Sequence, residues 1–344
     1  MKVAALTPSR YEAWDAFVDY HPSGRIYQKT VWKAIFEQAF GRKTLYYYAE
    51  DEAGEIQGVL PLVHFHTFIA GKQLISLPYV NYGGPIFKHE LAAELLMTKM
   101  RELLEATNSD VVEIRYDQPQ AFDLPVKENK VTFYLSLPDS ADDLLKSFKA
   151  KVRSQIKRPT KEGMYAQIGH INLLNDFYHV FCRNMRHLGT PVYSKKIFQV
   201  ILNSLPEQTH IVVVYSKDGL PVAAAFLMGY KQTMEIPWAS SLRKYNRYSP
   251  NMLLYWEALK LAIEKGYKIF DFGRGTREGG TYRFKKQWGG DEIQLYWYYL
   301  LGPNGQLPQV NKENPKFERA IKIWQKLPLW FTNLAGPPIV RNIP

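Results

Sequence analysis

The sequence lacks the features that mark secreted, disulfide-bonded and membrane-spanning proteins. Its 344 residues include one cysteine, Cys182, so no disulfide can form within the chain. No run of about 18 apolar residues occurs, and the most apolar stretch, residues 220–230, is too short to cross a bilayer as a helix. The first residues show no signal-peptide pattern. These absences predict a protein of the reducing cytoplasm.

Several catalytic patterns are absent as well. The chain has no Gly-x-Ser-x-Gly elbow and no Gly-x-x-x-x-Gly-Lys-Ser/Thr loop, which argues against an α/β-hydrolase and a P-loop ATPase. His64 and His66 alternate on one strand face without a third ligand at a suggestive spacing, so we predict no metal site. Cys182 lies in a helical apolar pattern and is interpreted as a packing residue.

Positive charge is in excess. The chain carries 44 Lys and Arg against 33 Asp and Glu, a formal net charge of +11, which favours an anionic partner. The excess is densest between Lys146 and Lys161, where no acidic residue intervenes. This stretch is either a solvated helix face or an anion-binding surface.

The chain repeats one order of predicted elements: strand, turn, strand, strand, helix, strand. In the first half these elements are residues 43–50, 56–66, 73–78, 89–107 and 110–116. In the second half they are residues 209–216, 220–229, 233–239, 250–265 and 268–272. Two copies of one unit explain the length better than a single large sheet.

We therefore predict an α/β fold of mixed α+β character with two tandem domains. The predicted boundaries are residues 1–140, a basic connecting helix within 141–164 that ends at Pro159, residues 165–305, and an amphipathic tail, 306–344.

Two local patterns resemble a known superfamily. The run FDFGR at 270–274 ends a predicted strand, and GGTYRFKKQWG follows at 279–289. The repeated order resembles the GNAT acyltransferase core, and the Phe284-Lys285 pair after a glycine-containing turn is similar to the Fem-type branch. The stretches QKTVW (28–32), PYVNYGGP (78–85) and RNMRHLGTP (183–191) extend the likeness to FemAB-like proteins of exopolysaccharide and PEP-CTERM systems, with a BioF-like acetyltransferase domain.

The resemblance implies two GNAT-like domains, each with a splayed mixed sheet, the second being catalytic. It implies an N-acyltransferase that moves an acyl or aminoacyl group from acyl-CoA or aminoacyl-tRNA to an amine on a cell-envelope or exopolysaccharide acceptor. These donors are co-substrates, and no tightly bound cofactor is expected. Residues 243–250 (RKYNRYSP) lack the glycines of a coenzyme A loop, and no helical-hairpin insertion typical of several Fem ligases is visible, so the donor stays open.

The expected partners are an anionic small molecule or a lipid-linked acceptor, with tRNA as one of the two donors and no DNA. The rival from another class is a non-catalytic basic module that docks RNA or polysaccharide-assembly machinery. A catalytic protein requires the candidate site residues to converge, whereas a nucleic-acid binder requires a broad basic stripe.

Two residues are the catalytic candidates. The resemblance implies that the ammonium of Lys285 lies against the reacting carbonyl, where negative charge develops; alternatively, Lys285 and Lys286 are exposed surface residues. Asp271 alternates with Phe270 and Phe272, so it points away from the core. It either receives the proton of the amine or positions the acceptor, or it pairs with Arg274 or Arg283.

A wider set is predicted to bind substrate. Arg153 and Lys157 lie four residues apart, which places them on one helix face suited to a phosphate. Beside Lys285 we expect contacts from Tyr282, Arg283, Phe284 and Arg274. Further aromatic residues offer stacking surfaces, although most aromatic residues belong to cores; these are Trp32, Tyr79, Tyr82, Trp238 and Tyr245.

The last predicted element is an amphipathic helix. Its apolar face contains Phe317, Ala320, Ile321, Trp324 and Leu327, and its basic residues are Lys316, Arg319, Lys322 and Lys326. The apolar continuation 328–331 allows two interpretations: docking on the protein's own core, or peripheral contact with the inner membrane.

Overall fold

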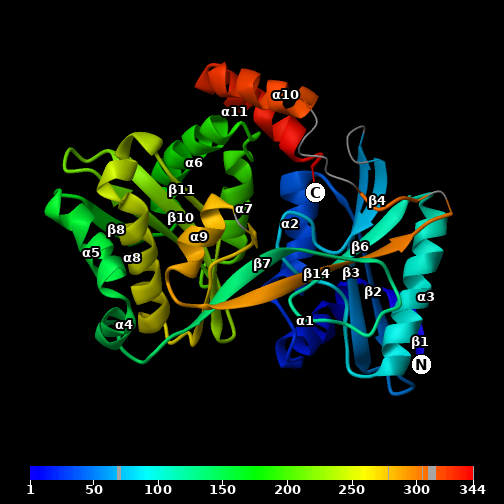
Figure 1. Ribbon diagram of the computed structural model, residues 1–344. Coiled ribbons are helices and arrows are strands. Elements are labelled where there is room, and N and C mark those ends of the chain that lie inside the picture. The colour runs from blue at the N-terminus through cyan, green and yellow to red at the C-terminus, as the bar shows by residue number, and fades with distance from the viewer. Residues whose placement is uncertain (68–70, 278, 304, 309–314, 344) are drawn as a thin grey trace. The chain divides into compact units, whose positions relative to one another are not determined.

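The structure, a computed structural model, describes residues 1–67, 71–277, 279–303, 305–308 and 315–343 (Figure 1). It contains two compact units that are not continuous in sequence. Unit 1 comprises Met1–Lys130, Gln294–Val310 and Arg341–Pro344, and unit 2 comprises Val131–Ile293 and Asn311–Val340. Strands β7 (Val126–Ser136) and β14 (Asp291–Leu301) each contain residues of both units.

Unit 1 is built on a mixed sheet in the order β1-β2-β3-β4-β6-β14. β4 and β6 are parallel, and the other neighbours are antiparallel. Helix α3 covers one face through apolar residues at helical spacing, while α1 and α2 contact β3 and β2. The elements are β1 (Lys2–Ala5), α1 (Tyr11–Tyr20), α2 (Thr30–Phe40), β2 (Lys43–Glu50), β3 (Ile56–Thr67), β4 (Gly71–Ile75), β5 (Ile86–Phe87), α3 (Glu90–Ala106) and β6 (Val111–Tyr116), with short 3-10 helices at Pro8–Arg10 and Ile26–Gln28.

Unit 2 repeats this plan in the order β7-β12-β11-β10-β9-β8. Only β11 and β12 are parallel among these neighbours, and helix α8 connects them, as α3 connects β4 and β6 in unit 1. The elements are α4 (Ala141–Ser147), α5 (Ala150–Lys161), β8 (Tyr165–Gly169), α6 (Leu174–Leu188), α7 (Lys195–Ser204), β9 (Thr209–Tyr215), β10 (Pro221–Tyr230), β11 (Thr233–Ser241), α8 (Pro250–Glu264), β12 (Ile269–Asp271), β13 (Gly275–Thr276), α9 (Gly280–Lys286), α10 (Pro315–Lys326) and α11 (Leu329–Val340), with 3-10 helices at Ile171–Leu173 and Arg243–Tyr248.

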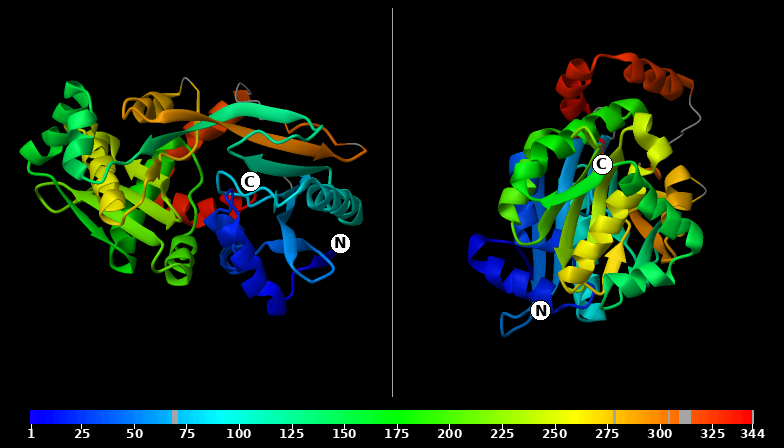
Figure 2. Two further views of the ribbon diagram at one scale, coloured as in Figure 1. Left: turned by 90° about the horizontal axis from the view of Figure 1, so that it is seen from below. Right: turned by 90° about the vertical axis from the view of Figure 1, so that its left-hand side faces the viewer.

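Helices cover both faces of the unit 2 sheet (Figure 2). α4, α5 and α8 pack with alternate residues of β9, β10 and β12 in one cluster of buried side chains. α6 and α7 contact the opposite face, where Phe177, Phe198 and Phe226 are fully buried. The alternation of inward and outward residues along each strand therefore builds two apolar layers around one sheet.

The ten repeated elements predicted from the sequence are all present, each within a few residues of its expected bounds. One helix boundary was wrong. α5 continues past Pro159 to Lys161, because a proline in the last turn removes only one amide donor, and the amides of Glu162 and Met164 donate back to the carbonyl of Pro159. The tail forms two helices, and α11 contains Pro337 and Pro338. Within the described chain no helix is long and apolar enough to cross a bilayer.

Phe270 provides a test of this core. It is fully buried on β12, and its ring centroid lies 5.1 Å from that of Phe272. Phe270→Ala should lower the free energy of unfolding by about 3–5 kcal/mol, because it removes buried apolar surface and leaves a cavity. Leu220→Ala is the matched control: Leu220 is 52% exposed in the turn before β10, and its replacement should change stability by less than about 0.5 kcal/mol. Urea unfolding of both variants measures the difference, and equal losses would contradict the assigned core.

Candidate functional site

The centre of the candidate site is the end of β12 in unit 2. β12 lies between β11 and β7, and Phe270 and Phe272 are fully buried on the α8 side. Asp271 points to the other face, as the alternation predicts, and it is 1% exposed. Its Oδ1 accepts hydrogen bonds from the hydroxyl of Thr132 at 2.5 Å and from the amide of Gly273 at 2.8 Å. The bond from the Gly273 amide thus links the carboxylate of Asp271 to the turn after β12, and the bond from Thr132 links it to β7.

A second buried carboxylate lies beside Asp271. Glu235 on β11 is opposite Asp271 in the parallel register and is 5% exposed. Directly opposed residues of neighbouring strands share a face of the sheet. The sequence analysis missed Glu235; its signal was the same alternation within residues 233–239, combined with the pairing of the two strands.

An irregularity in β11 adds Trp238 to that face. Phe226 of β10 pairs with Trp238, but Met228 pairs with Glu235, so β11 contains one extra residue between the two pairs. Because a bulge shifts the alternation by one residue, Glu235 and Trp238 point to the same side. Trp238 is 9% exposed and packs edge-on against Phe198 and Phe226, with ring centroids 5.2 and 5.5 Å away. Trp238 is therefore mainly part of the buried aromatic cluster with Phe198 and Phe226.

Lys285 on α9 reaches the turn after β12. It is 8% exposed, and its Nζ donates to the carbonyl oxygens of Gly273 at 2.7 Å and Arg274 at 3.0 Å. Burial lowers the pKa of Lys285 to about 8, although the charges of Asp271 and Glu235 act in the opposite direction. An ammonium has three N–H donors, and among the described residues only these two acceptors are found. One donor is thus left for a third acceptor.

The neighbours of Lys285 differ in their surroundings. Phe284 packs edge-on against Tyr255 at 4.9 Å, and Trp288 is 1% exposed in the same cluster, so both fix α9 to the core. Tyr282 is half-buried and donates to Glu292 at 2.5 Å. Arg283 is exposed and Arg274 is half-buried. The alternative prediction, that both lysines are exposed surface residues, holds for Lys286 but not for Lys285, which is buried.

The basic pair of α5 lies elsewhere in unit 2. Arg153 donates through Nη1 to the carbonyls of Phe148 at 2.6 Å and Lys146 at 3.2 Å, which satisfies the end of α4. Lys157 is exposed. Tyr245 is half-buried in the 3-10 helix before α8, and Ser249 then occupies the N-cap with φ 60° but without a side-chain hydrogen bond to the helix.

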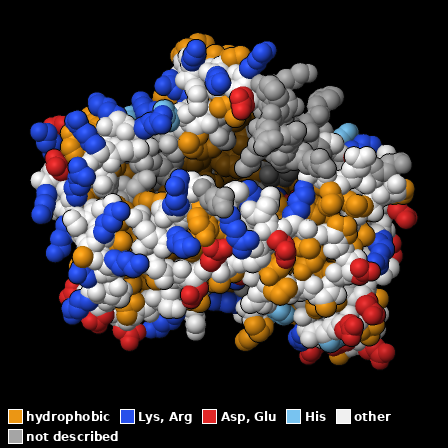
Figure 3. Space-filling view, viewed as in Figure 1, with side chains coloured by type: hydrophobic (Ala, Val, Ile, Leu, Met, Phe, Trp, Pro, Cys, Tyr) orange, Lys and Arg blue, Asp and Glu red, His pale blue; other side chains and the backbone are white. Residues whose placement is uncertain are grey.

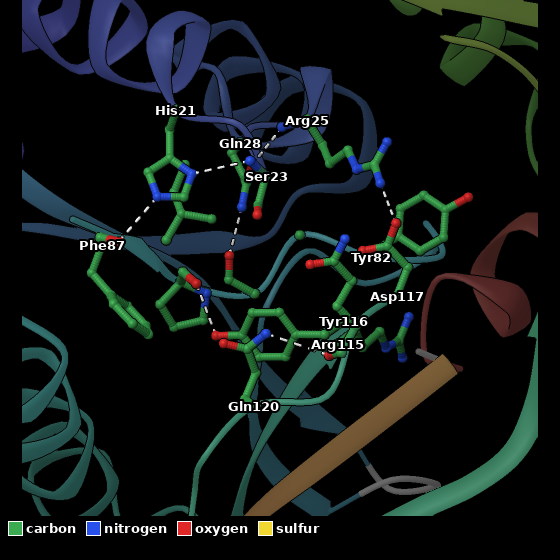
Figure 4. A pocket seen from close by; sticks show the side chains of 15 residues that line it. His21, Ser23, Arg25, Gln28, Tyr82, Phe87, Arg115, Tyr116, Asp117 and Gln120 are labelled. Atoms are coloured by element: carbon green, nitrogen blue, oxygen red, sulfur yellow. Dashed lines mark hydrogen bonds and ion pairs between the residues drawn. The ribbon is translucent and has the colours of Figure 1, made fainter. Parts of the chain in front are cut away.

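Unit 1 contains a cavity of about 260 Å³ lined by residues within 21–28, 82–87 and 115–120 (Figure 4). Tyr82 lies at its wall, with the guanidinium of Arg25 5.3 Å from the ring centroid. Arg25 also forms an ion pair with Asp117. The side-chain amide of Gln28 donates to the carbonyl of Gly84 at 2.6 Å. A cation, a carboxylate and an aromatic ring therefore meet in one hollow suited to a polar ligand.

The remaining aromatic candidates of unit 1 are core residues. Trp32 is 1% exposed, and its ring lies 5.0 Å from that of Tyr27. Tyr79 stacks on Phe40 with ring centroids 4.2 Å apart, although its φ of 69° is unusual for a bulky side chain. Throughout the described residues, no three His, Cys, Asp or Glu side chains lie close enough to share a metal ion.

Part of the chain matches a known protein family. The family model described as Acetyltransferase (GNAT) domain matches residues 146–286, which contain Glu235, Asp271 and Lys285. The Lipid II:glycine glycyltransferase of Staphylococcus haemolyticus (strain JCSC1435) is 21% identical over 419 aligned positions, covering 91% of this chain and 97% of that protein.

Two solved structures show the same fold. The crystal structure of FemX matches with a TM-score of 0.67 and 17% identity, over 87% of this chain and 98% of that one. A tandem GNAT protein from the clavulanic acid biosynthesis pathway matches with a TM-score of 0.57 and 10% identity, over 88% and 99%. The predicted mixed α/β class with tandem GNAT-like units is confirmed.

The chain is therefore a transferase with a GNAT acyltransferase domain. The chain is similar to the FemAB-like proteins, as the Phe284-Lys285 pattern indicated. The rival prediction of a non-catalytic binding module is therefore wrong.

Gly84 tests the wall of the unit 1 cavity. A Cβ at this position would lie 2.5 Å from Cζ of Tyr116, whose hydroxyl donates to the carbonyl of Pro85 at 2.8 Å. Because the ring is buried and bonded, Gly84→Ala should cost about 1–3 kcal/mol of unfolding free energy. Gly280→Ala is the control, since a Cβ there meets no atom within 4 Å. Chemical denaturation compares the two, and a Gly84→Ala variant as stable as wild type would disprove the close contact.

Proposed function

We propose that this protein transfers an acyl or aminoacyl group from acyl-CoA or aminoacyl-tRNA to an amine on a cell-envelope or exopolysaccharide-related acceptor. The observation that carries the proposal is the Lys285 ammonium, buried at the end of β12 within the segment that matches the GNAT family. The acceptor class is supported by the relative named as a lipid II glycyltransferase.

Lys285 is proposed to stabilise the carbonyl oxygen of the donor. When the amine attacks, that oxygen gains negative charge, and a prepositioned N–H donor in a poorly hydrated site stabilises it strongly. The carbonyls of Gly273 and Arg274 hold two N–H groups of Lys285 and thereby orient the third. The ammonium therefore needs little reorganisation during the reaction.

The two buried carboxylates are proposed to receive the proton that the attacking amine loses. Asp271 and Glu235 lie side by side on β12 and β11. Their charges also favour the protonated form of Lys285. Proton transfer from the amine to this pair, and from the pair to the departing coenzyme A thiolate or tRNA oxygen, would balance the step and restore both carboxylates while the product amide forms.

Substrate contacts are proposed in both units. In unit 2, Tyr282, Arg283 and Arg274 flank Lys285, and Lys157 with Arg153 offers charge to a phosphate. In unit 1, the cavity beside Tyr82 and Arg25 suits a polar or anionic ligand. We propose that three further aromatic residues pack behind these surfaces: Trp32, Tyr245 and Trp238.

The donor is tested directly by supplying both candidates. The purified full chain is incubated with lipid II and either radiolabelled glycyl-tRNA or radiolabelled acetyl-CoA, and the label in the extracted lipid is counted. The 419 aligned positions exceed the 344 residues of this chain, so the relative has residues without a counterpart here. Label transfer from neither donor to lipid II or to a panel of amine-bearing envelope precursors would contradict the proposed function.

Lys285→Ala should reduce kcat about 10- to 1,000-fold, the range typical for loss of one group that stabilises an oxyanion. Lys286→Ala is the matched control, because its side chain is exposed on the same helix, and it should retain kcat within about twofold. Near-ultraviolet circular dichroism checks that both variants keep the fold. Full turnover by Lys285→Ala would remove its proposed role.

The pH dependence of kcat tests the charge state of Lys285. Its pKa of about 8 means that the ammonium form is lost as pH rises through that value. If the cation stabilises the oxyanion, kcat should fall above about pH 8, while the acceptor amine governs the rise at lower pH. In Lys285→Arg, any remaining activity should lose this alkaline decline, since a guanidinium stays protonated. A rate that rises through pH 8 to a plateau in the wild type, and loses that rise in Lys285→Arg, would instead assign Lys285 as a base.

A further inference from the structure

Helix α11 presents an uncharged apolar face outward. Residues 329–340 contain no charged side chain. Trp330 is 69% exposed and Leu334 is 71% exposed, and four residues separate them, so they lie on one face of the helix. Phe331 beside them is 38% exposed.

The opposite face of α11 is fixed to unit 2. Thr332, Gly336 and Val340 recur every four residues and are buried. A Cβ at Gly336 would lie 2.9 Å from the amide nitrogen of Val192, so the helix backbone packs closely there. Because close packing occupies this small-residue face, Trp330 and Leu334 are directed outward.

Helix α10, which precedes α11 in the chain, carries exposed basic residues. Arg319, Lys322, Ile323 and Lys326 follow a helical spacing and are all exposed, Ile323 by 62%. The other side of α10 is anchored to α6: the side-chain amide of Gln325 donates to the carbonyl of His187 at 2.9 Å. In Figure 3, Lys and Arg side chains lie beside hydrophobic side chains over the helices at the top of the view.

We propose that this surface, comprising Arg319, Lys322, Ile323, Lys326, Trp330 and Leu334, binds an anionic lipid bilayer. Residues 315–340 include four Lys or Arg and one acid, Glu318, so the segment is complementary to acidic headgroups. Tryptophan and leucine enter the interface between headgroups and acyl chains, and lysines beside them keep their charge in water. The helices lie on the bilayer and do not span it.

The proposal is independent of the acyl-transfer chemistry, because the surface does not include Lys285, Asp271 or Glu235. Vesicle binding is measured without donor or acceptor, so failure of one proposal leaves the other standing. The surface also gives a physical account of peripheral localisation at a membrane, where a lipid-linked acceptor resides.

The test is co-sedimentation of the full chain with vesicles of phosphatidylcholine alone or with about one third phosphatidylglycerol. Wild type should bind the anionic vesicles and be released by salt. Trp330→Ser/Leu334→Ser and Lys322→Glu/Lys326→Glu should each weaken binding about tenfold or more. The matched controls are Tyr20→Ser/Leu220→Ser and Lys151→Glu/Lys161→Glu, which change exposed apolar or basic residues elsewhere. Both controls should bind like wild type.

Fluorescence provides a second readout. The emission of Trp330 should shift to shorter wavelength when anionic vesicles are added, and Trp330→Phe should abolish that change. Binding that the two surface variants retain, or absence of wild-type binding to anionic vesicles, overturns the proposal. A concentration-dependent dimer in lipid-free solution that Trp330→Ser/Leu334→Ser abolishes would assign the surface to a second copy of the chain instead.

Discussion

The hydrogen bonds from the Lys285 ammonium to the carbonyls of Gly273 and Arg274 connect helix α9 to the turn after β12. A buried ammonium is costly unless its donors are satisfied and opposite charge lies near. The turn after β12 supplies the acceptors, and Asp271 and Glu235 supply the charge. The turn itself depends on Asp271, which accepts the amide of Gly273, and on the positive φ of that glycine, 70°. Removing the Lys285 side chain takes a donor from the carbonyls of Gly273 and Arg274, and removing the Asp271 side chain takes the acceptor of the Gly273 amide.

The candidate site was predictable only where a local sequence pattern was sufficient. Alternation along 270–272 correctly placed Asp271 opposite the two phenylalanines, and the Fem-like pattern singled out Lys285 for a role that stays a proposal. Glu235 was missed because its position beside Asp271 arises from the parallel pairing of β11 with β12, which no periodicity specifies. The bulge that turns Trp238 to the same face is equally invisible in the sequence. Long-range pairing, not residue type, was the missing information.

Long-range pairing also determines the cavity of unit 1 and the division of the chain into two units. Arg25 and Asp117 are 92 positions apart, and only the folded sheet places them at one cavity. The repeat of strands and helices was readable because each element carries its own apolar period. The sequence does not reveal that β7 and β14 each contain residues of both units, because an alternating strand has the same pattern whichever neighbour it pairs with. The boundaries inferred at residues 140, 164 and 305 therefore stay a proposal about how the chain folds.

The carboxyl-terminal helices show why an apolar helix is ambiguous in sequence. The sequence allows two interpretations of this segment, docking on the protein or contact with a membrane, and α11 has both a buried face and an exposed apolar face. Its buried face consists of small or slender residues, Thr332, Gly336 and Val340, which permit the backbone to approach Val192 closely. Its largest residue, Trp330, stays outside. A helix that is apolar all round has no period to distinguish these faces. Shape complementarity distinguishes the two faces of α11. The face that fits the protein surface is buried, and the bulky face is proposed to contact the lipid bilayer, which needs no matching shape.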